Sequence, residues 1–192
     1  MVTVTFDPVA VVNESLGQLG KAPIVSLEDL DTTSVLCKQY FPSLLHTMLR
    51  EHRWNFAYKR IALAQDPTAP LSGFAYSYAL PPECVRVFTL NSSEEVAWKI
   101  EQRKLLTDES AATIEYIAYV DDPNIWDGMF RQAYVTLLAS RLCGPLTGND
   151  KKMVSLYQLY QLQLSDAKAV DGQEGSVDVY TATALTDDIR DE

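Results

Sequence analysis

The hydrophobic positions divide the chain into three zones, which are helical, then strand-rich, then helical again. The first helix is expected to begin near Asp7 and Pro8, because Asp is a good N-cap and Pro suits the first helical position. Apolar residues then recur at helical spacing, and Gly20 is suited to the C-cap. These apolar positions are Val9, Val12, Leu16 and Leu19.

A second helical stretch is predicted from about Thr32 to Arg53, because apolar residues again follow a helical period. Its apolar face consists of Val35, Leu36, Leu44, Leu45, Met48 and Leu49. Pro42 lies inside the stretch, and proline removes a backbone hydrogen bond within a helix. We therefore expect a kink or a break at Pro42.

From Trp54 the pattern changes to short apolar segments separated by turn residues, which predicts four or five antiparallel strands over residues 54–120. Val96, Trp98 and Ile100 alternate onto one face, and Asn91 to Ser93 suggests a hairpin turn before them. The extended segments are 54–58, 61–63, 74–80, 84–90, 95–100, 105–106 and 113–120.

Two further helices are predicted after the strand zone. Asp121, Asp122 and Pro123 should close that zone and cap a helix over 124–143, which Gly144–Pro145 should stop. Asn149 and Asp150 should open a last helix that runs to about Val170. The expected fold is α+β: one domain over 1–170, in which a bundle of helices from 7–53 and 124–170 carries the β-rich insertion 54–120.

The formal charge of the chain is −10, and residues 171–192 hold seven acids and one base, a net charge of −6. This last segment is polar and acidic, so we expect a flexible C-terminal tail. Proteins that grip nucleic acid match its phosphates with Lys and Arg. The acidic balance therefore argues against tight nucleic-acid binding, while leaving open a chain that lines a path for DNA.

The cysteines and the hydrophobic runs indicate a protein made without export. Cys37, Cys84 and Cys143 are odd in number and widely spaced, so we interpret them as reduced, mostly buried thiols. No apolar run approaches the ~20 residues of a membrane-spanning helix. The residues before Asp7 lack a basic region, so we expect no signal peptide and no association with a membrane.

The sequence gives little sign of catalysis, and we assign no catalytic, cofactor-binding or metal-ligating residue. His46 and His52 lie about 120° apart around a helix. No phosphate-binding loop or nucleophile motif occurs. Carboxylates near helix starts are more simply explained as N-caps than as an acid pair. The many Tyr and Trp residues suit either the core or an interface.

Four phrases together resemble the head-to-tail adaptor family of short-tailed bacteriophages, also called tail tubular protein A or gatekeeper. The order and spacing of the phrases match the family over roughly residues 8–170, although Arg53 stands where Pro is common. The phrases occupy residues 13–29 (NESLGQLGKAPIVSLED), 37–57 (CKQYFPSLLHTMLREHRWNFA), 76–87 (YSYALPPECVRV) and 105–130 (LLTD through YIAYVDDP to the helix around Phe130).

The resemblance implies a virion protein in the neck of the phage, assembled in the host cytoplasm. Copies would form a ring, usually described as twelve-fold, that meets the portal protein on one face and the tail nozzle on the other. DNA would pass through the channel during ejection without specific binding, and no cofactor is implied. The family supplies no accepted catalytic residues, so we expect a structural protein and not an enzyme.

Two other functions remain open from the sequence. One is a glycan or cell-wall hydrolase associated with the phage tail, whose candidate acids are Glu115, Asp121, Asp122 and Asp127. The other is a small binding module of a bacterial host, which would form no ring and have no affinity for portal protein.

Overall fold

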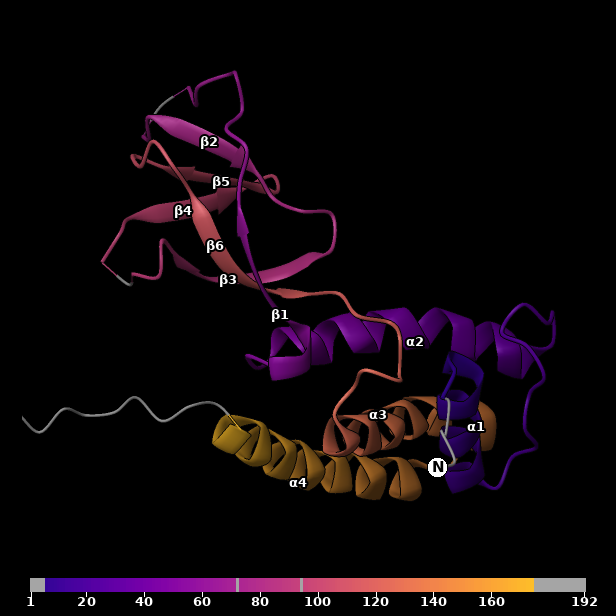
Figure 1. The fold of residues 1–192 in the computed structure, drawn as a ribbon. Coiled ribbons are helices and arrows are strands. Elements are labelled where there is room, and N and C mark those ends of the chain that lie inside the picture. The colour runs from indigo at the N-terminus through magenta and orange to yellow at the C-terminus, as the bar shows by residue number, and fades with distance from the viewer. Residues whose placement is uncertain (1–5, 72, 94, 175–192) are drawn as a thin grey trace, which may run out of the picture.

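A computed structural model describes residues 6–71, 73–93 and 95–174 of the chain. Within them the chain has the expected α+β fold, with helices gathered at one end and strands at the other (Figure 1). The α-helices are α1 (Pro8–Leu19), α2 (Thr32–Arg50), α3 (Gly128–Thr147) and α4 (Asp150–Glu174), and a short 3₁₀ helix, η1, spans Asn55–Ala57. The strands are β1 (Tyr58–Ala62), β2 (Tyr76–Ala79), β3 (Cys84–Leu90), β4 (Trp98–Glu101), β5 (Lys104–Thr107) and β6 (Thr113–Ala118).

The first helix has the predicted ends. The Asp7 side chain accepts a hydrogen bond from the Ala10 amide at 2.6 Å, and Pro8 occupies the first turn. Gly20 ends α1 in the left-handed conformation with φ of 70°. A Cβ is disfavoured in that conformation, which explains why glycine occupies the C-cap.

Both prolines expected to interrupt helices lie inside them instead. Helix α2 continues through Pro42, where the neighbouring Phe41 and Leu44 are buried in the core. Packing on both sides of the proline therefore outweighs the lost backbone hydrogen bond. Helix α3 continues through Pro145 to Thr147 and ends at Gly148, whose φ is 63°. The predicted stop at Gly144–Pro145 was wrong by one turn.

Helix α3 lies at the centre of the bundle, with α1, α2 and α4 packed against it. Its side chains are therefore buried around its circumference. Its cap is Asp127, whose carboxylate accepts from the amides of Met129 and Phe130 at 2.8 and 3.0 Å. The prediction that Asp121 and Asp122 cap this helix was wrong, because the chain makes a further turn before α3 begins.

In the described part of the strand zone, residues 54–71, 73–93 and 95–120, six strands form two three-stranded antiparallel sheets, where the sequence predicts four or five strands and one sheet. The strand orders are β1-β6-β3 and β2-β5-β4. A second core, separate from that of the helices, fills the space between the sheets and includes Tyr78, Leu105 and Tyr116. Strands β1 and β6 connect this zone to the bundle (Figure 1).

Two local predictions in the strand zone need correction. Residues 55–57 form η1 and not a strand, because Asn55 and Trp54 turn the chain from the bundle into β1. The turn at Asn91 and Ser92 exists, with φ values of 53° and 54°. It does not join a hairpin, because β3 and β4 on either side of it belong to different sheets.

Helix α4 begins as expected, with the Asn149 side chain accepting from the Lys152 amide at 3.0 Å. It extends past Val170 to Glu174, so residues 171–174 are helical and are not part of a flexible tail. The rest of the predicted tail, 175–192, lies outside the described residues.

Candidate assembly interface

Helix α4 has apolar side chains on two sides. Tyr160, Leu164 and Ala167 face inward and are buried. On other sides of the helix, Leu162 is 66% exposed and Val154 is 51% exposed. A surface helix normally confines its apolar residues to the stripe that faces the core. The exposed residues Val154, Leu159 and Leu162, with Tyr157, define what we call the α4 surface.

A second apolar surface lies on the loop between α1 and α2. Val25 is 90% exposed and Leu30 is 95% exposed, and Val35 in the first turns of α2 is also exposed. We call these three residues the loop surface. In Figure 1 this loop lies at the right-hand end of the bundle, whereas α4 forms its lower layer. The two surfaces therefore belong to different parts of the molecule.

The loop is held in place by specific contacts. The side-chain amide of Asn13 makes two hydrogen bonds to the backbone of Ile24. Its Nδ2 donates to the Ile24 carbonyl at 3.0 Å, and its Oδ1 accepts from the Ile24 backbone N–H at 2.8 Å. This clamp places Ile24 in the helical core, and the adjacent Val25 projects outward. Lys38 of α2 pairs with Glu28 of the loop. Because the loop is ordered beforehand, binding through it would cost less conformational entropy.

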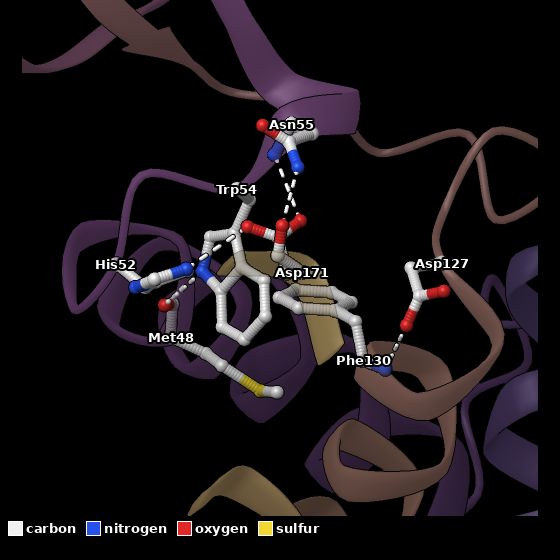
Figure 2. Close-up of polar contacts among 7 residues, drawn as sticks. All are labelled: Met48, His52, Trp54, Asn55, Asp127, Phe130 and Asp171. Atoms are coloured by element: carbon white, nitrogen blue, oxygen red, sulfur yellow. Dashed lines mark hydrogen bonds and ion pairs between the residues drawn. The ribbon is translucent and has the colours of Figure 1, made fainter. Parts of the chain in front are cut away.

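The end of α4 is joined to the start of the strand zone by a buried carboxylate (Figure 2). Asp171, only 4% exposed, accepts from the Asn55 amide at 2.9 Å. Its other carboxylate oxygen lies 2.9 Å from His52 Nε2. The Asn55 side chain donates to the Asp171 carbonyl at 2.6 Å, which satisfies one of the carbonyls left free at a helix C-terminus.

Trp54 fills the space beneath this polar contact. Its indole N–H donates to the Met48 carbonyl at 3.0 Å, near the end of α2. Its ring packs edge-on against that of Phe130, with the ring centroids 4.8 Å apart (Figure 2). The segment that links α2 to β1 therefore contacts α2, α3 and α4 where the strand zone begins. It belongs to one of the four phrases on which the family resemblance rests.

A second buried carboxylate, Glu115 of β6, is 8% exposed and organises one face of the β1-β6-β3 sheet. Its oxygens accept from Tyr58 Oη at 2.5 Å, Thr89 Oγ1 at 2.8 Å and Arg60 Nε at 2.9 Å. The hydrogen bond from Tyr58, with those from Thr89 and Arg60 and the charge of Arg60, lowers the pKa of Glu115 from 4.5 to about 2, although burial opposes this.

We expect Glu115→Gln to destabilise the protein by about 2 kcal/mol at pH 7, because charge-assisted hydrogen bonds would be lost. The folded pKa lies below the unfolded one, so the contribution of Glu115 is present above about pH 5 and is lost as the pH falls toward 2. Urea unfolding across this range should show a weaker acid dependence in the variant. Glu109→Gln, at an exposed acid that makes none of these contacts, serves as the control, and equal pH profiles for the two variants would contradict this role.

The other acids considered for hydrolysis have local structural roles or lie in solvent. Asp127 caps α3, and Asp122 accepts from the Asn124 amide at 3.0 Å. Asp121 is exposed and follows the strand zone. A general acid must be protonated at working pH. The low pKa of Glu115 makes it unsuited to that task.

The histidines and cysteines are separated in the structure. His52 contacts Asp171, whereas His46 lies near Tyr119, with ring centroids 6.5 Å apart. The three cysteines are buried, and burial raises the pKa of Cys37 to about 11. Across the described ranges no three His, Cys, Asp or Glu side chains are grouped closely enough to hold a metal ion.

Sequence reasoning missed Asp171 as a site residue because it was assigned to the tail. The signal was available, since Asp171 continues the buried stripe of Tyr160, Leu164 and Ala167 at helical spacing. A carboxylate at a stripe position, near a helix C-terminus where the dipole disfavours it, indicates a buried partner.

Among the helices that the structure describes, none is both long and apolar enough to cross a membrane. No protein-family model matches the chain, and a search of curated proteins finds no match.

Proposed function

We propose that this chain is a structural subunit of the head-to-tail connector of a short-tailed bacteriophage. Copies of it form a ring between the portal protein and the tail nozzle, and DNA passes through the ring. The proposal joins the resemblance of the four phrases to one structural observation. That observation is the pair of separate apolar surfaces, the loop surface and the α4 surface, on a single chain.

A closed ring needs two different, complementary patches on each subunit. The simplest arrangement places the loop surface of one copy against the α4 surface of the next. Exposed apolar residues that are scattered singly need no explanation, but grouped ones are typical of interaction sites. Val25 and Leu30 lie on one ordered loop, and Val154 and Leu162 lie about two turns apart on α4.

The charge of the chain agrees with a passive path for DNA. A net charge of −10 repels phosphates, so DNA would move past such a wall without adhering to it. The hydrolase alternative has less support, because the low pKa of Glu115 does not suit a general acid and Asp127 is used as a helix cap.

The functional test is the completion of tail-less heads. Phage heads that carry DNA and portal but lack this protein should become infectious when the purified chain is added together with the nozzle and remaining tail proteins. Omitting the chain is the control. If heads become equally infectious without the chain, it is not the connector subunit.

A further inference from the structure

An arginine-lined groove lies between the end of α2 and the two sheets, and the proposed ring does not use it. Its volume is about 570 Å³. Arg50, Arg86 and Arg103 line it together with the apolar side chains of Trp98 and Ile100. Strand β3 on one side and β4 on the other are each paired along a single edge, with β6 and β5 respectively. We call this the arginine groove.

The three arginines are oriented by backbone carbonyls and not by acids. Arg50 donates to the Val85 carbonyl at 2.7 Å, and Arg86 donates to the Arg50 carbonyl at 3.1 Å. Arg103 donates to the Pro81 carbonyl at 2.7 Å. Each bond engages one nitrogen of a guanidinium that carries five N–H donors, so most of the donors remain available.

These arginines differ from others in the chain. Arg60 pairs with Glu115, and Arg131 pairs with Glu14. Within the ranges 6–71, 73–93 and 95–174, no carboxylate lies within 4.0 Å of Arg50, Arg86 or Arg103. Three oriented guanidinium groups beside exposed apolar side chains fit an occupant that offers both carboxylates and apolar residues.

The chain itself contains such a segment. Residues 175–192 hold five acids and one base, a net charge of −4, and they include Val177, Val179, Leu185 and Ile189. This segment follows α4, whose last turn contacts His52 through Asp171, and Arg50 lies only two residues before His52. Its 18 residues span up to about 60 Å when extended, so the groove is within reach.

We propose that residues 175–192 bind in the arginine groove of the same chain. Their carboxylates pair with Arg50, Arg86 and Arg103, and their apolar side chains cover Trp98 and Ile100. Peptides that bind along unpaired strand edges combine main-chain hydrogen bonds with side-chain pockets in this way. The inference rests on charge and geometry and does not require the ring.

Tryptophan fluorescence reports the state of the groove directly. Trp54 is fully buried and Trp126 is 7% exposed, whereas Trp98 is partly exposed and lines the groove. Quenching by acrylamide, which is uncharged, therefore measures access to Trp98. Replacing Trp98 with Phe should abolish any difference in quenching between variants. That result would show that the difference comes from Trp98.

The full chain is compared at low salt with a variant in which Asp178, Asp187, Asp188, Asp191 and Glu192 are replaced by Asn or Gln. We expect the quenching constant to rise about twofold in the variant, and in the wild type at about 1 M salt, where the Debye length is near 3 Å. The control variant carries Asp166→Asn and Glu109→Gln, exposed acids of the described surface, and should quench like the wild type.

Two results would overturn the proposal. One is equal quenching of the wild type and the five-acid variant at low salt. The other is protection of Trp98 that increases with protein concentration, which would assign the segment to the groove of a second copy. Protection that is independent of concentration and is lost in the five-acid variant supports binding within one chain.

Discussion

Asp171→Ala is expected to lower the free energy of unfolding by about 3 kcal/mol. The substitution leaves the partly buried Asn55 amide and the His52 ring without their acceptor, and Asp171 itself is only 4% exposed. An unsatisfied buried donor costs about 1–3 kcal/mol. Urea unfolding followed by circular dichroism would measure the loss.

Asp166→Ala is the matched control, because Asp166 lies on the same helix and is exposed. It should change the free energy of unfolding by less than about 0.5 kcal/mol. Asp171→Asn keeps one oxygen as an acceptor and should lie between the two. If Asp171→Ala and Asp166→Ala prove equally stable, the buried carboxylate does not hold the bundle to the strand zone.

Leu162→Glu is expected to abolish ring formation while leaving the fold intact. The side chain is 66% exposed in the single chain, so the free energy of unfolding should change by less than about 0.5 kcal/mol. In the ring, a buried charge without a partner would oppose each contact between copies. The affinity of one copy for the next should therefore weaken at least about tenfold. Co-sedimentation with portal rings would measure binding, and Gln102→Glu, which adds the same charge at an exposed polar position outside both proposed surfaces, is the control.

The two proposed surfaces can be tested against each other. Leu30→Glu should also block assembly, because it places a charge on the loop surface, which faces the α4 surface of the next copy. Under conditions in which the wild-type chain forms rings, a mixture of the two variants should form a heterodimer, because one supplies an intact α4 surface and the other an intact loop surface. Rings formed by either variant alone would contradict the arrangement.

Much of the fold could be predicted because the responsible signals are local. Asp7 and Gly20 define α1 through their own side-chain chemistry and backbone conformation, and Cys84–Leu90 was predicted with its observed ends. Helix α2 has no break at Pro42, where the flanking residues pack in the core, and the predicted stop of α3 at Gly144–Pro145 was wrong, because the C-cap comes later, at Gly148. Local propensity cannot report such packing.

The arrangement of the strands depends on pairings that no local pattern encodes. Strand β1 pairs with β6 across the whole strand zone, and the turn between β4 and β5 uses Gln102 and Arg103 at positive φ. Neither residue is typical of a turn that needs positive φ, so the β4–β5 hairpin carried no recognisable signal. The split into two sheets depends on which strands pair, and no local pattern in the sequence predicts that pairing.

For the candidate surfaces, the sequence shows which residues are apolar or charged, whereas only the structure shows which of them are exposed or brought together. Val154 and Leu162 can be identified as apolar from the sequence, but their exposure depends on which side of α4 meets α3. Asp171 was hidden by the acidic composition around it. The arginine groove is assembled from three separate segments, so proximity along the chain could not reveal it.

Electron microscopy of the purified chain mixed with portal rings tests the central claim most directly. The account predicts a second ring of density stacked on one face of the portal ring, with the chain present in equal copies around the axis. Portal rings without added density at saturating concentrations of correctly folded chain would contradict it.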